Sequence, residues 1–216
     1  MMNKQTVYDL KPEGKVVYIR VDYNVPHDKE GNILDDRRIR ATIPTIQYLL
    51  NQGAAIVLAS HMGRPKGEYK AELSLRPAAA RLAELLQKEV KFIPDCIGPE
   101  ADQAKEELKP GEIILLENLR FHKEEEKNGE DFARQLASLA EVGINDAFGC
   151  CHRAHASVAG ITKFLPWLPA SSWKKKSASS AVLSIIRLTP SQLSSAALKF
   201  PTRSKSFPTF CRKSTS

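Results

Sequence analysis

The sequence predicts an α/β domain of the doubly wound class, in which a parallel sheet carries helices on both faces. Between residues 16 and 148, four short apolar runs rich in β-branched residues alternate with segments of helical period. Apolar runs without polar alternation are typical of strands covered on both faces, as in parallel sheets. Strands that alternate with helices of about ten to fifteen residues favour this fold class. A hydrophobic content of 42% is enough for a core.

The predicted elements follow one another along the chain. The strands are residues 16–22 (VVYIRVD), 55–60 (AIVLAS), 112–117 (EIILLE) and 142–148 (VGINDAF). The helices are residues 38–51, 75–87 and 131–141. Apolar residues recur at helical spacing in the last two helices, at Leu82, Leu85 and Leu86 and at Phe132, Leu136 and Leu139. Ser74 and Asn128 are the predicted N-caps, and Gly53 is predicted to end the first helix.

The composition changes after Pro166, and this change predicts a boundary. Residues 167–216 contain 13 Ser, no Asp, Glu or Gly, and no sustained helical or strand period. Their one apolar run, residues 181–188, is too short to build a domain. We therefore expect an α/β domain over residues 1–166 and a disordered, basic, Ser-rich tail of non-native character over residues 167–216.

The formal net charge of +7 belongs to that tail. Nine Lys or Arg and no acid lie from residue 167 onward, which leaves 23 basic and 25 acidic side chains before it. The charge therefore predicts neither a specific nucleic-acid partner nor a membrane surface. The polar N-terminus and the lack of a long apolar run favour a cytoplasmic protein. The cysteines are Cys96, Cys150, Cys151 and Cys211; none has CxxC spacing, and we expect reduced thiols.

Polar side chains follow every predicted strand, at the sheet edge where ligands bind in doubly wound folds. The candidate site residues are Asp22, Asn24, Arg38, His61, Arg64, Arg120 and Arg153. Guanidinium groups match phosphate and carboxylate bidentately, so the arginines and the histidine predict a basic crevice for a compact dianion. The aspartate and the asparagine would accept hydrogen bonds from hydroxyls of the same ligand.

The same segments admit other interpretations. The arginines could instead form strand-end salt bridges with Asp22, Glu117 and Asp146. His152 and His155 have the spacing of a metal pair, but no further ligand lies at a standard zinc-site offset, so no metal is expected. Residues 123–127 (KEEEK) are expected to form a solvated face. Neither GxGxxG nor GxxxxGK[ST] occurs, so no nucleotide cradle is recognised.

Five segments carry a resemblance to a known family. They are RVDYNVP, DRRIRATIPTI, SHMGRPKG, LLENLRFHKEEEKN and NDAFGCCHRAHAS, in this order. With them, residues 7–166 resemble the N-terminal domain of the phosphoglycerate kinases. The resemblance implies a two-domain phosphotransferase of glycolysis. Its N-terminal half binds 3-phosphoglycerate or 1,3-bisphosphoglycerate, and its C-terminal half binds magnesium ADP or ATP.

The resemblance also implies a role for each candidate residue. Asp22 and Asn24 would bind the hydroxyl and carboxylate end of the glycerate. The phosphate that is not transferred would be held by His61, Arg64, Arg120 and Arg153. Arg38 would face the phosphoryl group in flight and is the expected catalytic residue, because such reactions are catalysed by positioning and charge neutralisation. Cys150 and Cys151 depart from the family, and we expect the site to tolerate them.

The family's nucleotide-binding segment is not found after Pro166. The family would continue with a segment like AVAGFLMEKE and later with GGAKVSDK. Residues 170–176 (ASSWKKK) and 194–204 (SSAALKFPTRS), read one nucleotide out of frame with permitted codons, give GFLMEKE and ILGGAKVSDKI. We therefore hypothesise a one-nucleotide frameshift near residues 166–167.

The residues and the resemblance leave three alternative functions. The first is a phosphoglycerate kinase whose chain lacks the nucleotide domain and is an inactive monomer by itself. The second is a phosphoglycerate-binding module without catalysis. The third is a polyanion binder that uses the basic tail, and it is the least favoured of the three.

Overall fold

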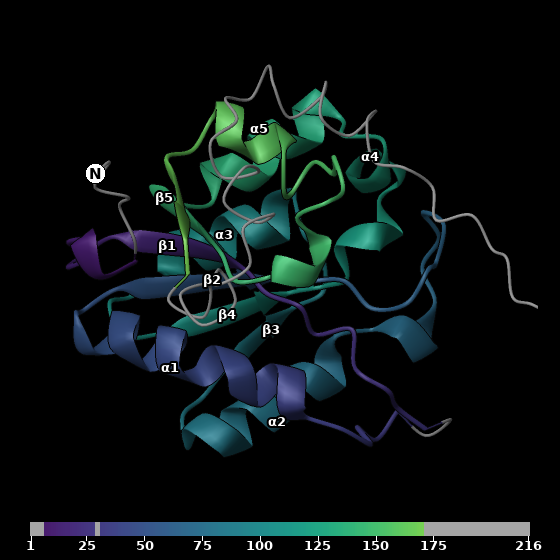
Figure 1. Ribbon diagram of the computed structural model, residues 1–216, viewed down its shortest axis with the longest axis horizontal. Coiled ribbons are helices and arrows are strands. Elements are labelled where there is room, and N and C mark those ends of the chain that lie inside the picture. The colour runs from purple at the N-terminus through teal and green to yellow at the C-terminus, as the bar shows by residue number, and fades with distance from the viewer. Residues whose placement is uncertain (1–6, 29–30, 171–216) are drawn as a thin grey trace, which may run out of the picture.

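Six parallel strands form one sheet in the order β3-β4-β2-β1-β5-β6 (Figure 1). The strands are β1 Val16–Arg20, β2 Ala55–Ala59, β3 Lys91–Ile93, β4 Ile113–Leu116, β5 Val142–Asn145 and β6 Trp167–Pro169. The coordinates are a computed structural model that describes residues 7–28 and 31–170. All four predicted strands are present and parallel, so the predicted fold class is confirmed.

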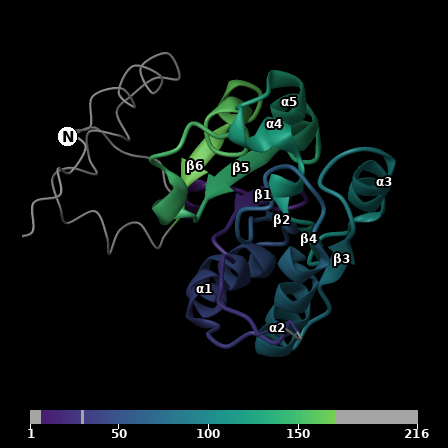
Figure 2. The same ribbon diagram turned by 90° about the vertical axis from the view of Figure 1, so that its right-hand side faces the viewer.

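Helices cover both faces of this sheet, as Figure 2 shows. They are α1 Arg37–Asn51, α2 Arg76–Leu86, α3 Pro99–Glu107, α4 Lys123–Glu126 and α5 Glu130–Ser138. Short 3-10 turns are η1 Val7–Asp9, η2 Ala71–Leu73, η3 Leu119–Phe121, η4 Phe148–Cys150 and η5 Gly160–Lys163. The first two α-helices lie on one face and α3, α4 and α5 on the other. Among the described residues, no helix is long and apolar enough to cross a membrane.

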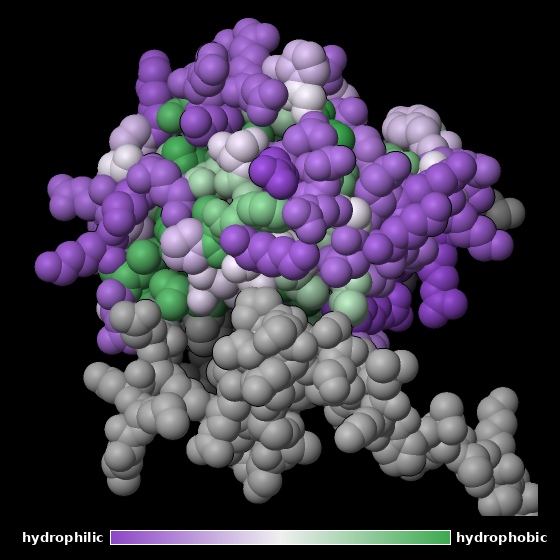
Figure 3. Space-filling view, turned by 90° about the horizontal axis from the view of Figure 1, so that it is seen from above, coloured by the Kyte–Doolittle hydropathy of each residue, from purple (hydrophilic) through white to green (hydrophobic). Residues whose placement is uncertain are grey.

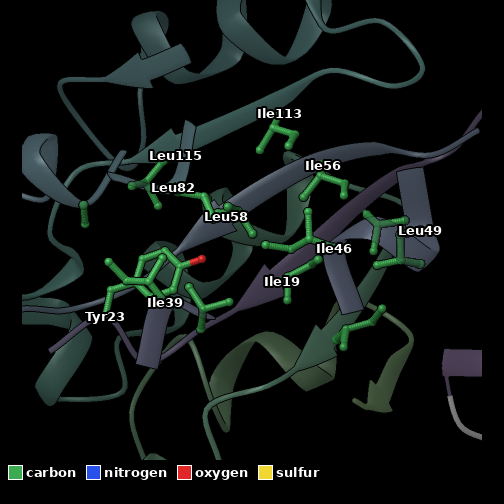
Figure 4. Packing of buried hydrophobic residues seen from close by; sticks show 14 of the residues in the cluster. Ile19, Tyr23, Ile39, Ile46, Leu49, Ile56, Leu58, Leu82, Ile113 and Leu115 are labelled. Carbon is green, nitrogen blue, oxygen red and sulfur yellow. The ribbon is translucent and has the colours of Figure 1, made fainter. Parts of the chain in front are cut away.

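Alternate residues of each strand enter opposite layers of the core. From β2, Ile56 and Leu58 pack with α1 and α2, whereas Val57 and Ala59 pack with α3 and α5. Figure 4 shows part of the first layer, in which side chains of α1 reach those of the central strands. The outer face of the second layer is mostly hydrophilic, with apolar areas between the polar side chains (Figure 3). The two-sided burial explains why the strands lack polar alternation.

Besides strand β6, two α-helices and one strand were not predicted, for local reasons. The edge strand β3 has only three residues and exposes Lys91. Helix α3 buries only the small residues Ala101 and Ala104, which give a weak apolar period. Helix α4 is a single short turn. The helices that were predicted bury larger side chains and are found within one or two residues of their predicted starts.

The helix ends differ from the predicted caps in two cases. Helix α2 begins after Leu75, although Ser74 Oγ still accepts a hydrogen bond from Arg76 N at 3.2 Å. Helix α5 begins after Gly129, and Asn128 takes a left-handed φ of 57° instead of capping it. Both N-cap predictions are therefore wrong. Gly53, with a φ of 76° just beyond α1, is confirmed as the residue that ends that helix.

Sheet pairing continues beyond Pro166. Strand β6 pairs with β5, and Gly143 N donates to Pro166 O at 2.7 Å. A Cβ at Gly143 would collide with the Trp167 ring, so the glycine allows the indole to lie on the strand. The sheet thus includes residues that the composition assigned to the tail. Residues 171–216, with Cys211, the apolar run 181–188 and nearly all of the out-of-frame segments, lie outside the described residues.

Candidate functional site

The carboxyl ends of the parallel strands bring the predicted site residues to one edge of the sheet. Asp22 and Asn24 follow β1, His61 and Arg64 follow β2, Arg120 follows β4, and Arg153 follows β5. Ligand-capable atoms of Asp22, His61 and Cys150 lie within 4.8 Å of one another. The loops after β1, β2 and β5 therefore meet at this edge, as the sequence predicted.

Arg38, in the first turn of α1, faces the end of β1. Its Nη1 donates to Asp22 Oδ2 at 2.7 Å, and the two side chains are 52% and 22% exposed. A pair this accessible contributes about 0–1 kcal/mol, so an anionic ligand can take over the guanidinium at little cost. The salt-bridge interpretation thus holds at Asp22. It fails at Glu117, which accepts from Leu75 N at 2.8 Å and Ser74 Oγ at 2.7 Å.

Arg120 is buried at 3% exposure, and one hydrogen bond of its side chain orients it. Its Nη1 donates to Gly63 O at 2.7 Å, and its Nε lies 3.4 Å from Glu126 Oε1 without hydrogen-bond geometry. Burial lowers the pKa of this guanidinium, which still stays charged at neutral pH. The sheet edge therefore holds a buried cation whose orientation is set before any ligand arrives.

Asn118 connects the loop after β2 with the loop after β4. This fully buried amide accepts from Met62 N at 3.2 Å and Arg120 N at 3.1 Å. Its Nδ2 donates to Met62 O at 2.7 Å and Leu73 O at 2.9 Å. All four contacts satisfy buried or half-buried backbone groups. Asn118 was not singled out in the sequence, where it reads only as a residue inside the ENLRF segment.

Asn24 ties the end of β1 to the loop after β2. Its Oδ1 accepts from Gly63 N at 2.9 Å. Gly63 has a φ of 61°, and a Cβ there would meet the Leu73 side chain, so this position requires glycine. The neighbouring Arg64 is exposed, and Arg153 is half-buried with its Nε 3.3 Å from His152 Nε2. The loops after β2 and β5 therefore carry one exposed and one half-buried arginine.

His61 is 5% exposed and lies among cations. Its Nδ1 is 3.1 Å from Arg20 Nη2, and Arg120 and Arg153 also act on it. Burial first, and then these positive charges, hold the pKa of His61 far below its usual range. The imidazole is therefore neutral at physiological pH and can serve as a hydrogen-bond donor rather than as a cation.

A buried polar network beneath the site was missed in the sequence. Glu125 is fully buried and accepts from Ser157 N at 2.9 Å and Ser157 Oγ at 2.6 Å, with His155 Nδ1 at 3.6 Å. Arg20 Nε donates to the same hydroxyl at 2.9 Å. The prediction that residues 123–127 form a solvated face is therefore wrong for Glu125, because the α4 turn points it into the protein.

The residues at this edge of the sheet disfavour both a bound metal ion and a reactive thiolate. His155 faces Glu125 while His152 is exposed, so the two do not form a metal pair. The nearby Asp22, His61 and Cys150 could approach one ion, but surrounding guanidinium groups oppose a cation there. Burial raises the pKa of the Cys150 thiol, which disfavours the thiolate that metals and electrophiles require.

A doubly wound sheet with buried and exposed arginines at the carboxyl ends of its strands defines an α/β domain suited to a small multivalent anion. The chain matches the family described as Phosphoglycerate kinase over residues 7–172. The phosphoglycerate kinases of Desulforudis audaxviator and Moorella thermoacetica are 54% and 56% identical to it over 165 residues. The chain therefore belongs to the phosphoglycerate kinase family.

The match covers part of these relatives. Each alignment spans 76% of this chain and 42% of the relative. Among solved structures, the phosphoglycerate kinase of Coxiella burnetii aligns with a TM-score of 0.71 at 35% identity, covering 81% of this chain and 43% of that one. For the enzyme of Pyrococcus horikoshii the values are 0.72, 34%, 79% and 43%. The chain thus spans about two fifths of the length of its relatives.

Proposed function

We propose that this domain binds 3-phosphoglycerate or 1,3-bisphosphoglycerate. In a complete protein it would serve phosphoryl transfer between 1,3-bisphosphoglycerate and ADP, the glycolytic reaction of phosphoglycerate kinase. The observation that carries the proposal is the convergence of Asp22, His61 and the buried Arg120 at the edge of the sheet. Family membership adds independent support.

Each residue has a proposed role that its environment allows. The residues proposed to hold the phosphate that stays on the glycerate are His61, Arg64, Arg120 and Arg153. Asp22 and Asn24 would accept from the glycerate hydroxyl and fix the carboxylate end. Arg38 would exchange its exposed ion pair with Asp22 for the phosphoryl group and neutralise charge on the equatorial oxygens.

The nucleotide is proposed to bind elsewhere. Family members use magnesium with ADP or ATP, and the described domain carries neither glycine signature of a nucleotide cradle. Catalysis would therefore require the second domain of the family, both for the nucleotide and for excluding water. We expect this chain alone to give negligible turnover in a coupled assay with ADP; turnover like that of an intact kinase would refute this part.

Isothermal titration calorimetry with 3-phosphoglycerate tests the binding proposal. We expect binding by the wild-type chain and its loss in Arg64→Ala and in Arg153→Ala, because both remove a phosphate-directed cation. Arg134→Ala is the matched control, since that arginine stacks on Phe164 in the α5 layer. No binding by the wild type would overturn the proposal.

The second candidate is a phosphoglycerate-binding module without catalysis. It is favoured by the described domain itself, which brings arginines to the sheet edge but carries neither glycine signature of a nucleotide cradle. Calorimetry and the coupled assay together distinguish the two candidates. Binding without turnover supports the module, whereas binding with turnover supports an active kinase. Under either proposal, we infer a cytoplasmic monomer without a specific nucleic-acid or membrane partner.

We also propose that the segment beyond the α/β domain arises from a one-nucleotide frameshift near residues 166–167. The support is the out-of-frame match of residues 170–176 and 194–204 to family segments. Pairing of β6 with β5 is compatible with this, because backbone hydrogen bonds require no particular side chains. The DNA sequence around this point is the test: a shifted frame that does not encode a kinase C-terminal domain would remove the hypothesis.

A further inference from the structure

Arg20 is a buried arginine at the end of β1 that has no part in the proposed ligand contacts. It is 1% exposed, and all three of its nitrogen groups contact protein. Nε donates to Ser157 Oγ at 2.9 Å, Nη1 donates to Val21 O, and Nη2 lies 3.1 Å from His61 Nδ1. A long charged side chain held at three points has little freedom to move.

A buried carboxylate supports this arginine from behind. Ser157 Oγ accepts from Arg20 and donates to Glu125 Oε1 at 2.6 Å, so one hydroxyl joins the guanidinium to the carboxylate. Glu125 is fully buried, and burial would raise its pKa, but its contacts with His155, Arg20 and Ser157 lower it overall. The carboxylate is therefore ionised and balances the buried positive charge.

The contact with Arg20 decides which nitrogen of His61 carries the hydrogen. A guanidinium has donors and no acceptor. The 3.1 Å contact to Nδ1 is therefore a hydrogen bond only if Nδ1 offers its lone pair. In a neutral imidazole the hydrogen then resides on Nε2, and that nitrogen is free to donate.

We propose that Arg20 is a positioning residue that fixes His61 as the neutral Nε2–H tautomer and thereby makes it a hydrogen-bond donor to the anion in the crevice. The inference relies on the proposed function only for the identity of that anion. The network of Glu125, Ser157 and Arg20 sets the tautomer in the free protein, so the donor is in place before the ligand binds.

The charged groups around His61 agree with a neutral ring. They are Arg20 and Asp22 from the end of β1, Arg120 from the loop after β4, and Cys150, Arg153 and His155 from the segment after β5. Burial disfavours the charged ring most, and the arginines, which outnumber the single carboxylate, add to this effect. An imidazolium would be disfavoured at this position, whereas a neutral donor meets no electrostatic penalty.

Nitrogen-15 NMR of the full chain with labelled histidine tests the tautomer without any ligand. The His61 signals are assigned by their loss in His61→Gln. We expect a neutral Nε2–H ring in the wild type from pH 8 to pH 5.5. A hydrogen on Nδ1, or an imidazolium at pH 6, would overturn the proposal.

Variants test the role of Arg20. In Arg20→Met we expect a mixture of both tautomers, and in Arg20→Lys the Nε2–H form is retained because the ammonium also donates. Ser157→Ala keeps Arg20 and its contact with His61 Nδ1, so the Nε2–H form should persist in that variant. An unchanged tautomer in Arg20→Met contradicts the proposal; if that variant does not fold, the tautomer of the wild type decides.

Calorimetry with 3-phosphoglycerate connects the tautomer to binding. We expect Arg20→Met to lose about tenfold or more in affinity and Arg20→Lys to recover part of that loss. If the wild type shows the Nε2–H ring but binds no 3-phosphoglycerate, the proposed function fails and the tautomer assignment stands. If the wild type binds while the ring carries its hydrogen on Nδ1, the proposed function stands and this inference fails.

Discussion

Two parts of the proposed site differ in burial: His61 and Arg120, the buried pair of its phosphate side, and Asp22, Asn24 and Arg38, its transfer side. The buried pair is 5% and 3% exposed and is hydrogen-bonded to protein, whereas Arg64 and Arg153 of the same side are exposed and half-buried. On the transfer side, the Arg38 side chain is 52% exposed and pairs with Asp22 at the surface. Buried groups that are hydrogen-bonded to protein keep their geometry without ligand, whereas an exposed ion pair exchanges easily. Buried, oriented groups suit a phosphate that stays on its substrate, whereas an exchangeable ion pair suits a phosphoryl group that is transferred.

The largest expected effect comes from Asn118, which holds the loops of the phosphate side together. We expect Asn118→Leu to lower the free energy of unfolding by about 3 kcal/mol, because it leaves buried backbone groups unsatisfied. Urea unfolding measures this. Asn32→Ala removes an exposed amide that bonds Asp28 and is the control. A loss no greater than that of the control would show that the loops do not depend on this amide.

The second largest effect is expected on ligand affinity, when the side chain of the buried Arg120 is truncated. We expect Arg120→Ala to weaken 3-phosphoglycerate binding about 30-fold, which corresponds to about 2 kcal/mol. Calorimetry measures this loss, and Arg38→Ala measured in parallel should lose less in this chain. If Arg38→Ala lost more ground-state affinity than Arg120→Ala, the division into a phosphate side and a transfer side would be wrong.

The pH dependence of stability reports on the buried imidazole. Because the pKa of His61 is lowered in the folded state, the unfolded state binds more protons below its own pKa of about 6.5, and stability falls as pH falls through that value. Between pH 7.5 and 5.5 we expect the wild type to lose about 1.4 kcal/mol more than His61→Gln. Equal slopes in urea unfolding would mean that the folded protein can protonate this ring.

The smallest effect is expected on the transfer side. Arg38→Ala should shift Tm by less than about 3 °C, because its ion pair is solvent-exposed. Arg37→Ala, the neighbouring exposed arginine that pairs with Asp35, is the matched control. A shift in Arg38→Ala comparable with that of Asn118→Leu would show that the Asp22 pair is structural, and differential scanning calorimetry distinguishes the outcomes.

The sequence predicted most of the fold because most of its strands and helices have a clear apolar pattern. Apolar runs of β-branched residues such as residues 55–60 have few alternatives to a buried strand, and the positions after them are then fixed at one sheet edge. Short or small-residue elements such as β3 and α3 carry no such pattern. The end of the sheet was also misjudged, since Trp167 joins it through backbone pairing that composition does not report.

The sequence by itself determined the fold class, the family segments and the order of the charged residues after the strands, because these depend on local pattern and chain order. Only the tertiary structure decided which charges are buried, since burial depends on neighbours far apart in the chain. Arg20 contacts Ser157 and His61. Glu125, which lies in an acidic run of the sequence, is buried and accepts a hydrogen bond from Ser157. These long-range hydrogen bonds distinguish the buried part of the proposed site from the exposed Asp22–Arg38 pair, which can exchange its partners.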